Sequence, residues 1–429
     1  MQLILLYSVF YFLFSCSVPH DNLYDWNVMI YIAADNDEQN SISEFADYSI
    51  KRITLGASEK SSNINVSVFC DGRYKRYTGG KSGANHFKLG ENGMVNSKYL
   101  GETNSGSLDT FKRFFDDNFK RSAKNVLIFW GHSSGLPFLT RELNSRGLLM
   151  DDNTLEDKKS MTIDEIAEAV EYAKNKIGRK IDIVGLDVCS MMYVEVAYLL
   201  KDSAHYFASS QGKQDAFSWD YESFVKRLSE SDESADSLVS WLVEDFKNFY
   251  DYEYFEIGIQ NRGDRLSNDT FSVVDLNKID DLKKSFNSLI DDIFNLSLFN
   301  RSETDIRKFI DILSVSKVGG CENAIDMISF FERLKNLMRE FGIDSIDGKI
   351  SDFLEEMNSF VAFNYSRRSY KSSRGISIRG YTVGDTAPTL SEYKDYGFEA
   401  NNNWLALLRS FYEKDKRYYL ENVILKIAE

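Results

Sequence analysis

NVLIFWGHSSG (residues 125–135) and IDIVGLDVCS (residues 181–190) are the two stretches that decide the fold. Each opens on an apolar run that is short for a helix and closes on glycine or polar residues, which is typical of a buried strand. A helical pattern lies between them from Thr162 to Lys176, and Thr162 and Glu165 form a capping-box pair at its start. A strand, a helix and a second strand in this order predict parallel strands in one sheet.

The same alternation extends outward from these two strands. Further strand-like runs and helical stretches flank them: strands at 26–34, 63–70 and 205–209, and helices at 38–54, 107–120 and 191–200. We therefore expect an α/β domain over residues 26–230, with a mostly parallel sheet and helices on both faces. From 231 to 429 helical periodicity dominates, so this part is predicted to be a mainly helical C-terminal region that completes the fold.

Composition excludes several classes of protein. The 429 residues are 43% hydrophobic, which provides ample material for a core, and they carry a net charge of −15. No basic block interrupts this acidic balance, so we expect no nucleic acid partner. Four Cys and four His without a CxxC spacing predict no metal cluster. Asp35, Asn36 and Asp37 offer oxygen ligands that could hold calcium, but helix capping is the simpler explanation for three such residues in a turn.

The N-terminus is typical of an export signal. Residues 1–15, MQLILLYSVFYFLFS, are almost wholly apolar and uncharged, and Cys16 follows them. The sequence LFSC at 13–16 resembles a bacterial lipobox, which predicts a signal peptide over 1–15, lipidation of Cys16 and a tether over 16–25. An ordinary cleaved signal or an uncleaved anchor remains the alternative. We expect an exported protein, lipid-anchored in a bacterial envelope and either periplasmic or at the cell surface.

Two residues suited to nucleophilic catalysis follow the two central strands. His132 and Cys189 come just after them, and the carboxyl ends of parallel strands meet at one edge of a sheet. A cysteine needs a base to form thiolate at neutral pH, and imidazole can take that proton. Taken singly, each residue is more often a buried small side chain or a turn histidine. Oxyanion donors are expected at the N–H of Cys189 and in the turn formed by Gly131, Ser133 and Ser134.

GHSSG at 131–135 followed by DVCSM at 187–191 resembles the clostripain family of cysteine peptidases. This family is in the caspase-like group, which has a His-then-Cys dyad. Other segments agree, so that the likeness runs from about residue 25 to 412: WNVMIYIAADND at 26–37, CSMMYVEVA at 189–197, residues 206–221, and GISI at 375–378 with Trp404. The resemblance implies a caspase-like sheet and protein or peptide substrates.

The resemblance also assigns roles to residues. It implies that Cys189 is the nucleophile, that His132 is the general base or acid, and that no cofactor is needed for the dyad, although some relatives use calcium. Asp187 matches the family's acid in a pocket that favours Arg or Lys before the scissile bond; a helix N-cap is the alternative for Asp187. Asp215 and Trp219 lie in the segment that lines this pocket, where Lys213 would repel a cationic side chain.

Two further expectations come from the family pattern. Relatives are often cut between the His and the Cys at a basic residue, and the candidates here are Arg141, Arg146, Lys158 and Lys159. The family usually has Gly where this chain has Ser133, so a positive φ there would strain the backbone and displace an oxyanion donor.

The sequence as a whole predicts an exported cysteine endopeptidase that acts through a thioester acyl-enzyme, with a preference for Arg or Lys that Lys213 opposes. The alternative is a catalytically weak or inactive surface lipoprotein that uses the same scaffold to bind a protein partner without cleaving it.

Overall fold

The computed structural model describes most of the chain, and the residues it describes are 24–36, 41–57, 63–73, 81–90, 92–137, 147–154, 156, 160–230, 234–253, 269–296, 298, 301–319, 321, 324–367, 370, 372–380, 394–399 and 403–419.

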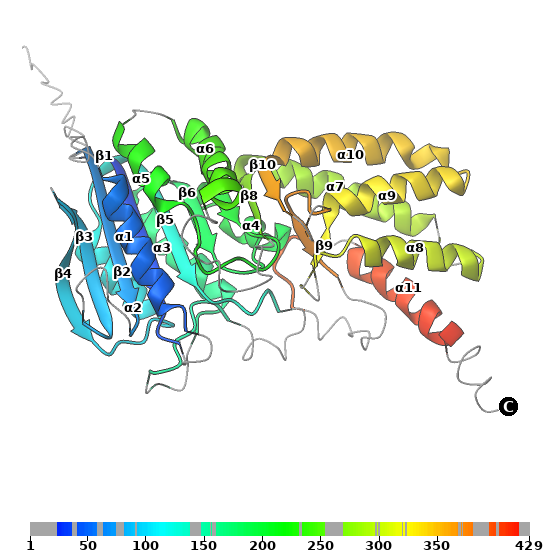
Figure 1. The fold of residues 1–429 in the computed structure, drawn as a ribbon. Helices are drawn as coiled ribbons and strands as arrows, with labels where there is room; N and C mark the ends of the chain where they lie inside the picture. The colour runs from blue at the N-terminus through cyan, green and yellow to red at the C-terminus, as the bar shows by residue number, and fades with distance from the viewer. Residues whose placement is uncertain are drawn as a thin grey trace, which may run out of the picture.

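A single large sheet organises the described residues, with its strands in the order β10-β8-β7-β6-β5-β1-β2-β3-β4 (Figure 1). These strands are β1 (Tyr24–Ala33), β2 (Ile64–Asp71), β3 (Ala84–Gly90), β4 (Gly93–Gly101), β5 (Ser122–Gly131), β6 (Ile181–Asp187), β7 (Ala204–Ser209), β8 (Thr270–Asp275) and β10 (Val361–Ser366). The five central strands, from β7 to β2, are parallel, whereas the pairings β7–β8 and β8–β10 at one edge and β2–β3 and β3–β4 at the other are antiparallel. The predicted mostly parallel sheet is confirmed.

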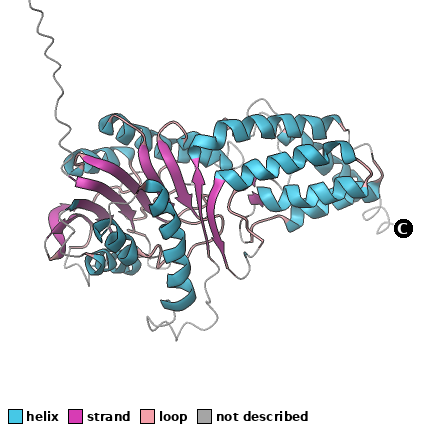
Figure 2. Ribbon diagram, turned by 90° about the horizontal axis from the view of Figure 1, so that it is seen from above, coloured by secondary structure: helices cyan, strands magenta, loops and turns pink. Residues whose placement is uncertain are grey.

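Helices cover both faces of this sheet (Figure 2). The helices that the structure describes are α1 (Ser43–Gly56), α2 (Leu108–Asn118), α3 (Ile163–Ile177), α4 (Val194–Leu200), α5 (Tyr221–Glu230), α6 (Ala235–Asn248), α7 (Ile279–Asn295), α8 (Glu303–Val315), α9 (Met327–Glu340), α10 (Asp347–Phe360) and α11 (Trp404–Tyr419). Alternate residues of β1 show why two layers are needed. Val28 and Ile30 pack with α1, α5 and α6, whereas Met29 and Tyr31 pack with α2 and α3 on the other face.

The C-terminal region is mainly helical and joins the same sheet. Its helices α7 to α11 gather beyond the β10 edge (Figure 1), and its strands β8 and β10 extend the sheet from β7. A second, two-stranded sheet pairs β9 (Ala324–Asp326) with β11 (Ser377–Arg379). The residues after 230 therefore complete the sheet that the residues before 230 begin.

Two local features differ from expectation. The helix expected from Met191 begins at Val194, because the N–H groups of Met191 and Met192 both donate to the carbonyl of Ser210 at 2.9 Å. The hairpin of β3 and β4 was not predicted, since its sequences ANHFKLG and GMVNSKYLG mix polar residues and glycine and β4 is largely exposed. The capping box of Thr162 and Glu165 at the start of α3 is confirmed.

Substituting Ala for Gly185 in β6 should destabilise the protein. An added Cβ would lie 2.4 Å from Cη2 of Trp219 and 3.3 Å from Cγ1 of Ile128, so a packed layer must move. Overpacking of this kind costs about 1–3 kcal/mol. We expect chemical denaturation to show this loss in the free energy of unfolding.

Gly348→Ala is the matched control, because nothing lies within 4 Å of its added Cβ and Gly348 is in α10. This variant should be neutral or slightly stabilised. Equal midpoints for the two variants would contradict the packing of Trp219 on Gly185.

Candidate active site

The register of β5 and β6 places His132 and Cys189 at the same edge of the sheet. These parallel strands are neighbours, and Trp130 pairs with Asp187 at their carboxyl ends. His132 and Cys189 each follow that pair by two residues, and both side chains are partly buried. Adjacent strand ends in register place the two residues at the edge of the sheet where ligands bind in open parallel sheets.

The backbone of Gln214 contacts the thiol of Cys189 through both its N–H and its carbonyl oxygen. The N–H of Gln214 donates to Sγ at 3.3 Å, and Sγ lies 3.7 Å from the carbonyl oxygen of Gln214. Burial raises the pKa of the Cys189 thiol, and this effect exceeds the lowering by the Gln214 N–H and by the charge of Lys213. The thiol therefore favours its protonated form and needs a base to become a nucleophile.

The turn around His132 is held by the segment that begins at Gly147. The carbonyl of His132 accepts from the N–H of Leu149 at 3.0 Å, and Ser133 forms an antiparallel bridge with Leu148. The N–H of Ser134 donates to the carbonyl of Gly147 at 3.2 Å, so this candidate oxyanion donor serves the loop.

The strain expected at Ser133 does not occur. Among the described non-glycine residues with positive φ are Leu149, Ser190 and Ser218, and Ser133 is not one of them. One of them, Ser190, lies next to Cys189; it has φ 54° and donates its N–H to the carbonyl of Gly212 at 2.8 Å. Cys189 therefore sits on a tight turn that pairs with the segment from Ser210 to Gln214.

This turn also changes two expectations about Cys189 and Asp187. Because α4 begins at Val194 with Tyr193 as its N-cap, the helix N-terminus does not directly follow Cys189. Asp187 lies seven residues before the helix, so the N-cap alternative for it is wrong.

Asp187 is nearly inaccessible, with 3% of its surface exposed. Its Oδ2 accepts hydrogen bonds from the hydroxyl of Tyr221 at 2.7 Å and from the hydroxyl of Ser218, and its Oδ1 accepts from the side-chain amide of Gln214. Burial raises the pKa of Asp187 to about 7, although hydrogen bonds from the side chains of Ser218, Tyr221 and Gln214 and from the backbone N–H of Trp219 lower it. The carboxyl expected to hold a cation is thus already surrounded by donors from this chain.

The other two residues predicted for the specificity pocket have structural contacts. The ring of Trp219 is buried against Gly185 and makes an edge contact with Phe271, with ring centroids 4.9 Å apart. The carboxylate of Asp215 accepts from the N–H of Phe217 at 3.0 Å within its own loop.

Sequence reasoning missed four residues that shape this site: Gln214, Ser218, Tyr221 and Tyr370. Gln214 and Ser218 lie in a segment that departs from the family pattern, and Tyr221 opens α5. Tyr370, far away in the chain, accepts from the N–H of Lys213 at 3.2 Å. Its Cζ would lie 2.6 Å from a Cβ on Gly212, so a glycine is required where the ring packs.

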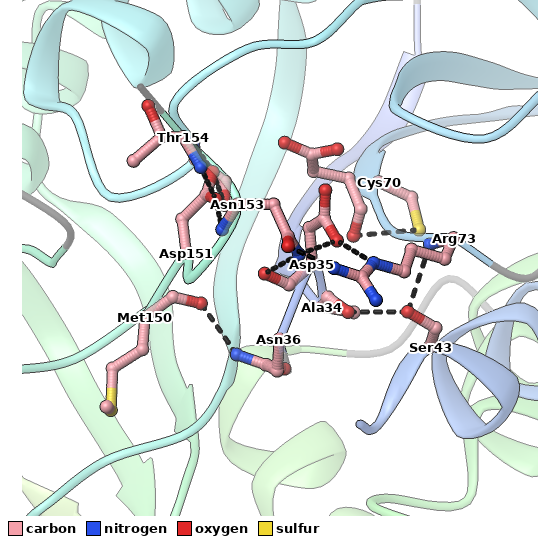
Figure 3. A network of polar contacts seen from close by, with 12 residues as sticks. Ala34, Asp35, Asn36, Ser43, Cys70, Arg73, Met150, Asp151, Asn153 and Thr154 are labelled. Atoms are coloured by element: carbon pink, nitrogen blue, oxygen red, sulfur yellow. Dashed lines mark hydrogen bonds and ion pairs between the residues drawn. The ribbon is translucent and has the colours of Figure 1, made fainter. Parts of the chain in front are cut away.

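An acidic group lies near the segment that holds His132. Carboxylate oxygens of Asp35, Glu102 and Asp151 all lie within 4.8 Å of one another and could hold a cation. Nε of Arg73 lies 3.2 Å from Asp35, and the N–H of Thr154 donates to Asp151 (Figure 3). The N–H of Ser105 also donates to Asp151. The amide of the predicted ligand Asn36 donates instead to the carbonyl of Met150 at 2.8 Å, and Asp37 lies outside the described residues.

Several predictions fall outside the described residues: the signal peptide over 1–15, Cys16 with most of its tether, and the processing candidates Arg141, Arg146, Lys158 and Lys159. Among the helices that the structure describes, none combines the length and apolar character needed to cross a membrane.

This fold, with its His and Cys at adjacent strand ends, defines a caspase-like α/β protein. The chain belongs to the clostripain family, whose model matches residues 30–414, and it is therefore a cysteine peptidase, a hydrolase that acts on proteins or peptides. No curated protein matches the chain.

Solved structures with the same fold are also cysteine proteases. One is a secreted C11 cysteine protease from Bacteroides thetaiotaomicron in complex with an irreversible peptide inhibitor. It has a TM-score of 0.61 and 18% identity, over 90% of this chain and 99% of that one. Another is an inactive zymogen C11 protease from Parabacteroides distasonis, with a TM-score of 0.55 and 18% identity, over 83% of this chain and 92% of that one.

Replacing Asp187 by Asn should change how stability depends on pH. The pKa of an aspartate in an unfolded chain is about 3.9, whereas that of Asp187 is about 7. Between these values the folded protein holds a proton that the unfolded chain has released, so the free energy of unfolding falls as pH rises from 4 to 7. The Asn variant lacks this contribution, which over three pKa units amounts to about 4 kcal/mol.

Urea denaturation at pH 4, 5.5 and 7 measures the effect. The stability of Asp187→Asn relative to the unsubstituted protein should rise with pH across this window. The exposed Asp311 on α8 offers a control, Asp311→Asn, whose difference should stay nearly constant. A constant difference for Asp187→Asn as well would contradict the raised pKa.

Proposed function

We propose that the chain is an endopeptidase in which His132 and Cys189 form the catalytic dyad. The observation that carries this proposal is the register of β5 and β6, which brings both residues to adjacent strand ends two positions beyond a paired Trp130 and Asp187. Membership of the clostripain family supports the same assignment.

The reaction is acyl transfer in two steps. His132 accepts the thiol proton of Cys189, and the thiolate attacks the scissile carbonyl to form a tetrahedral oxyanion. The oxyanion collapses to a thioester as His132 returns the proton to the leaving amine. Water, deprotonated by His132, then attacks the thioester, releases the acyl product and restores the thiol. The N–H of Cys189 and N–H groups of the Gly131–Ser133 turn are the proposed oxyanion donors.

The burial of the Cys189 thiol suggests that the active site becomes fully formed only after the chain is cleaved. Burial raises the pKa of the thiol, and the backbone N–H of Gln214 donates a hydrogen bond to its sulfur. Cleavage between His132 and Cys189, at Arg141, Arg146, Lys158 or Lys159, is the event proposed from the family pattern. A relative with this fold is described as an inactive zymogen, which supports the idea.

Export is a second part of the proposal. The apolar residues 1–15 and the lipobox-like LFSC ending at Cys16 support secretion with lipid anchoring in a bacterial envelope. A protein with the same fold is described as secreted.

Hydrolysis of a peptide library varied at the residue before the scissile bond tests the dyad. Cys189→Ala should abolish turnover, because no nucleophile remains. His132→Ala should lower kcat by about 10²–10⁴-fold, the usual contribution of a general acid–base group. Protein starting after Cys16 is assayed with and without calcium, both intact and after nicking between 141 and 159.

Cys70→Ala is the control, since Cys70 is a buried thiol in β2 and its loss should leave turnover in place. Hydrolysis that persists in Cys189→Ala would refute the assignment. Absence of hydrolysis in folded, nicked protein would favour the alternative of a surface lipoprotein that binds a partner without cleaving it.

A further inference from the structure

Gln214 contacts both the nucleophile and the acid of the pocket. Its backbone N–H donates to Sγ of Cys189 at 3.3 Å, while its side-chain amide donates to Oδ1 of Asp187. These two contacts fix the side chain between the thiol and the carboxyl. A substrate side chain that is to bond Oδ1 of Asp187 therefore competes with the amide of Gln214 for that oxygen.

Both oxygens of the carboxyl behind this amide already accept hydrogen bonds from this chain. Hydroxyl groups of Ser218 and Tyr221 occupy Oδ2, and Gln214 occupies Oδ1. An ammonium or guanidinium group would have to displace a donor and lose its own hydration in a site where Asp187 is 3% exposed. The charge of Lys213, close enough to lower the pKa of the Cys189 thiol, adds repulsion against a cation.

The other end of the same amide needs a hydrogen-bond donor. Oε1 of Gln214 is buried and accepts no hydrogen bond from any described residue. A buried carbonyl without a donor costs free energy, and a ligand that supplies an N–H recovers it. A neutral carboxamide meets this need without bringing a charge into the pocket.

We propose that Gln214 is a specificity-determining residue, which makes the pocket select a carboxamide side chain, Gln or Asn, before the scissile bond in preference to Arg or Lys. The proposal rests on the proposed function of His132 and Cys189. A site built to pair with a substrate N–H discriminates strongly against an analogue that lacks it, because the buried acceptor is then left unpaired.

Fluorogenic peptides that differ only in the residue before the scissile bond test this selection. The residues are Gln, Asn, Lys, Arg and norleucine, which is unbranched and lacks a donor. In the unsubstituted enzyme, nicked if activation requires it, kcat/KM for the better carboxamide should exceed that for Lys, Arg and norleucine by at least about tenfold.

Two variants of Gln214 distinguish the effect of its side-chain amide on substrate selection from the effect of the rest of the loop. Gln214→Ala should remove the preference for the carboxamide over norleucine and raise kcat/KM for Lys and Arg about tenfold or more, since Asp187 becomes reachable. Gln214→Glu keeps the size of the side chain and should shift selection to Lys and Arg. Lys213→Ala controls for charge: any gain it gives to Lys and Arg substrates should diminish with added salt, whereas the gain in Gln214→Ala should persist.

The outcomes distinguish this proposal from the proposed function. Cleavage after Lys or Arg as fast as after Gln and Asn in the unsubstituted enzyme overturns the role of Gln214 and leaves the dyad intact. A selection unchanged in both folded Gln214 variants also overturns it. If nothing is cleaved, the proposed function fails. Calorimetric binding of the same peptides to Cys189→Ala protein then tests the selectivity of the pocket by itself. Tighter binding of Gln or Asn peptides supports the pocket, and equal or weaker binding than that of Lys peptides overturns it.

Discussion

The parallel pairing of β5 with β6 is the interaction on which the rest of the structure depends. Both strands lie at the centre of the sheet, and their apolar side chains are buried on both faces. A slip of one residue would turn every side chain of one strand to the opposite face and move its end by about 3.3 Å. The packing that selects the register of Trp130 with Asp187 therefore also sets the separation of His132 and Cys189.

The loop after β7 is the second constraint, since it carries Gln214. One end is tied to the small sheet: the amide of Gln211 donates to Asp326 and Ser377, both at 2.9 Å, and accepts from the N–H of Gly375 at 2.8 Å. The other end is tied to α1, where Arg52 pairs with the buried Asp220 at 2.6 Å. The C-terminal region thus helps to place the loop that carries Gln214.

The parts of the fold that could be predicted from sequence are those that bury continuous apolar runs. NVLIFW and IDIVGL are such runs, and their ends located His132 and Cys189. The hairpin of β3 and β4 could not be predicted, because an exposed edge strand carries little apolar signal.

The hydrogen-bond partners of Asp187 could not be predicted from the sequence, for a different reason. Its donors Gln214, Ser218 and Tyr221 are 27 to 34 residues away in the chain, and their directions depend on the path of one irregular loop. The motif that identified Asp187 as a pocket acid says nothing about whether other side chains already occupy it. Local spacing can thus locate a carboxyl without revealing its accessibility.

Arg379 connects the segments that follow β5 and β6. Its fully buried guanidinium contacts Glu195 of α4 at 3.2 Å, Glu399 at 2.8 Å and the carbonyl of Pro137 at 3.1 Å. Burial and the neighbouring Glu399 raise the pKa of Glu195, while Arg379 lowers it, so one guanidinium group contacts two carboxyl groups.

Such a buried ionic group adds little net stability compared with apolar side chains of the same volume, since desolvation offsets the attraction. Its effect is directional, because each hydrogen bond fixes one segment. Pro137 lies five residues after His132, and Glu195 lies six residues after Cys189. A single cation therefore restrains the segments that leave both strand ends, and the separation set by β5 and β6 is maintained beyond the sheet itself.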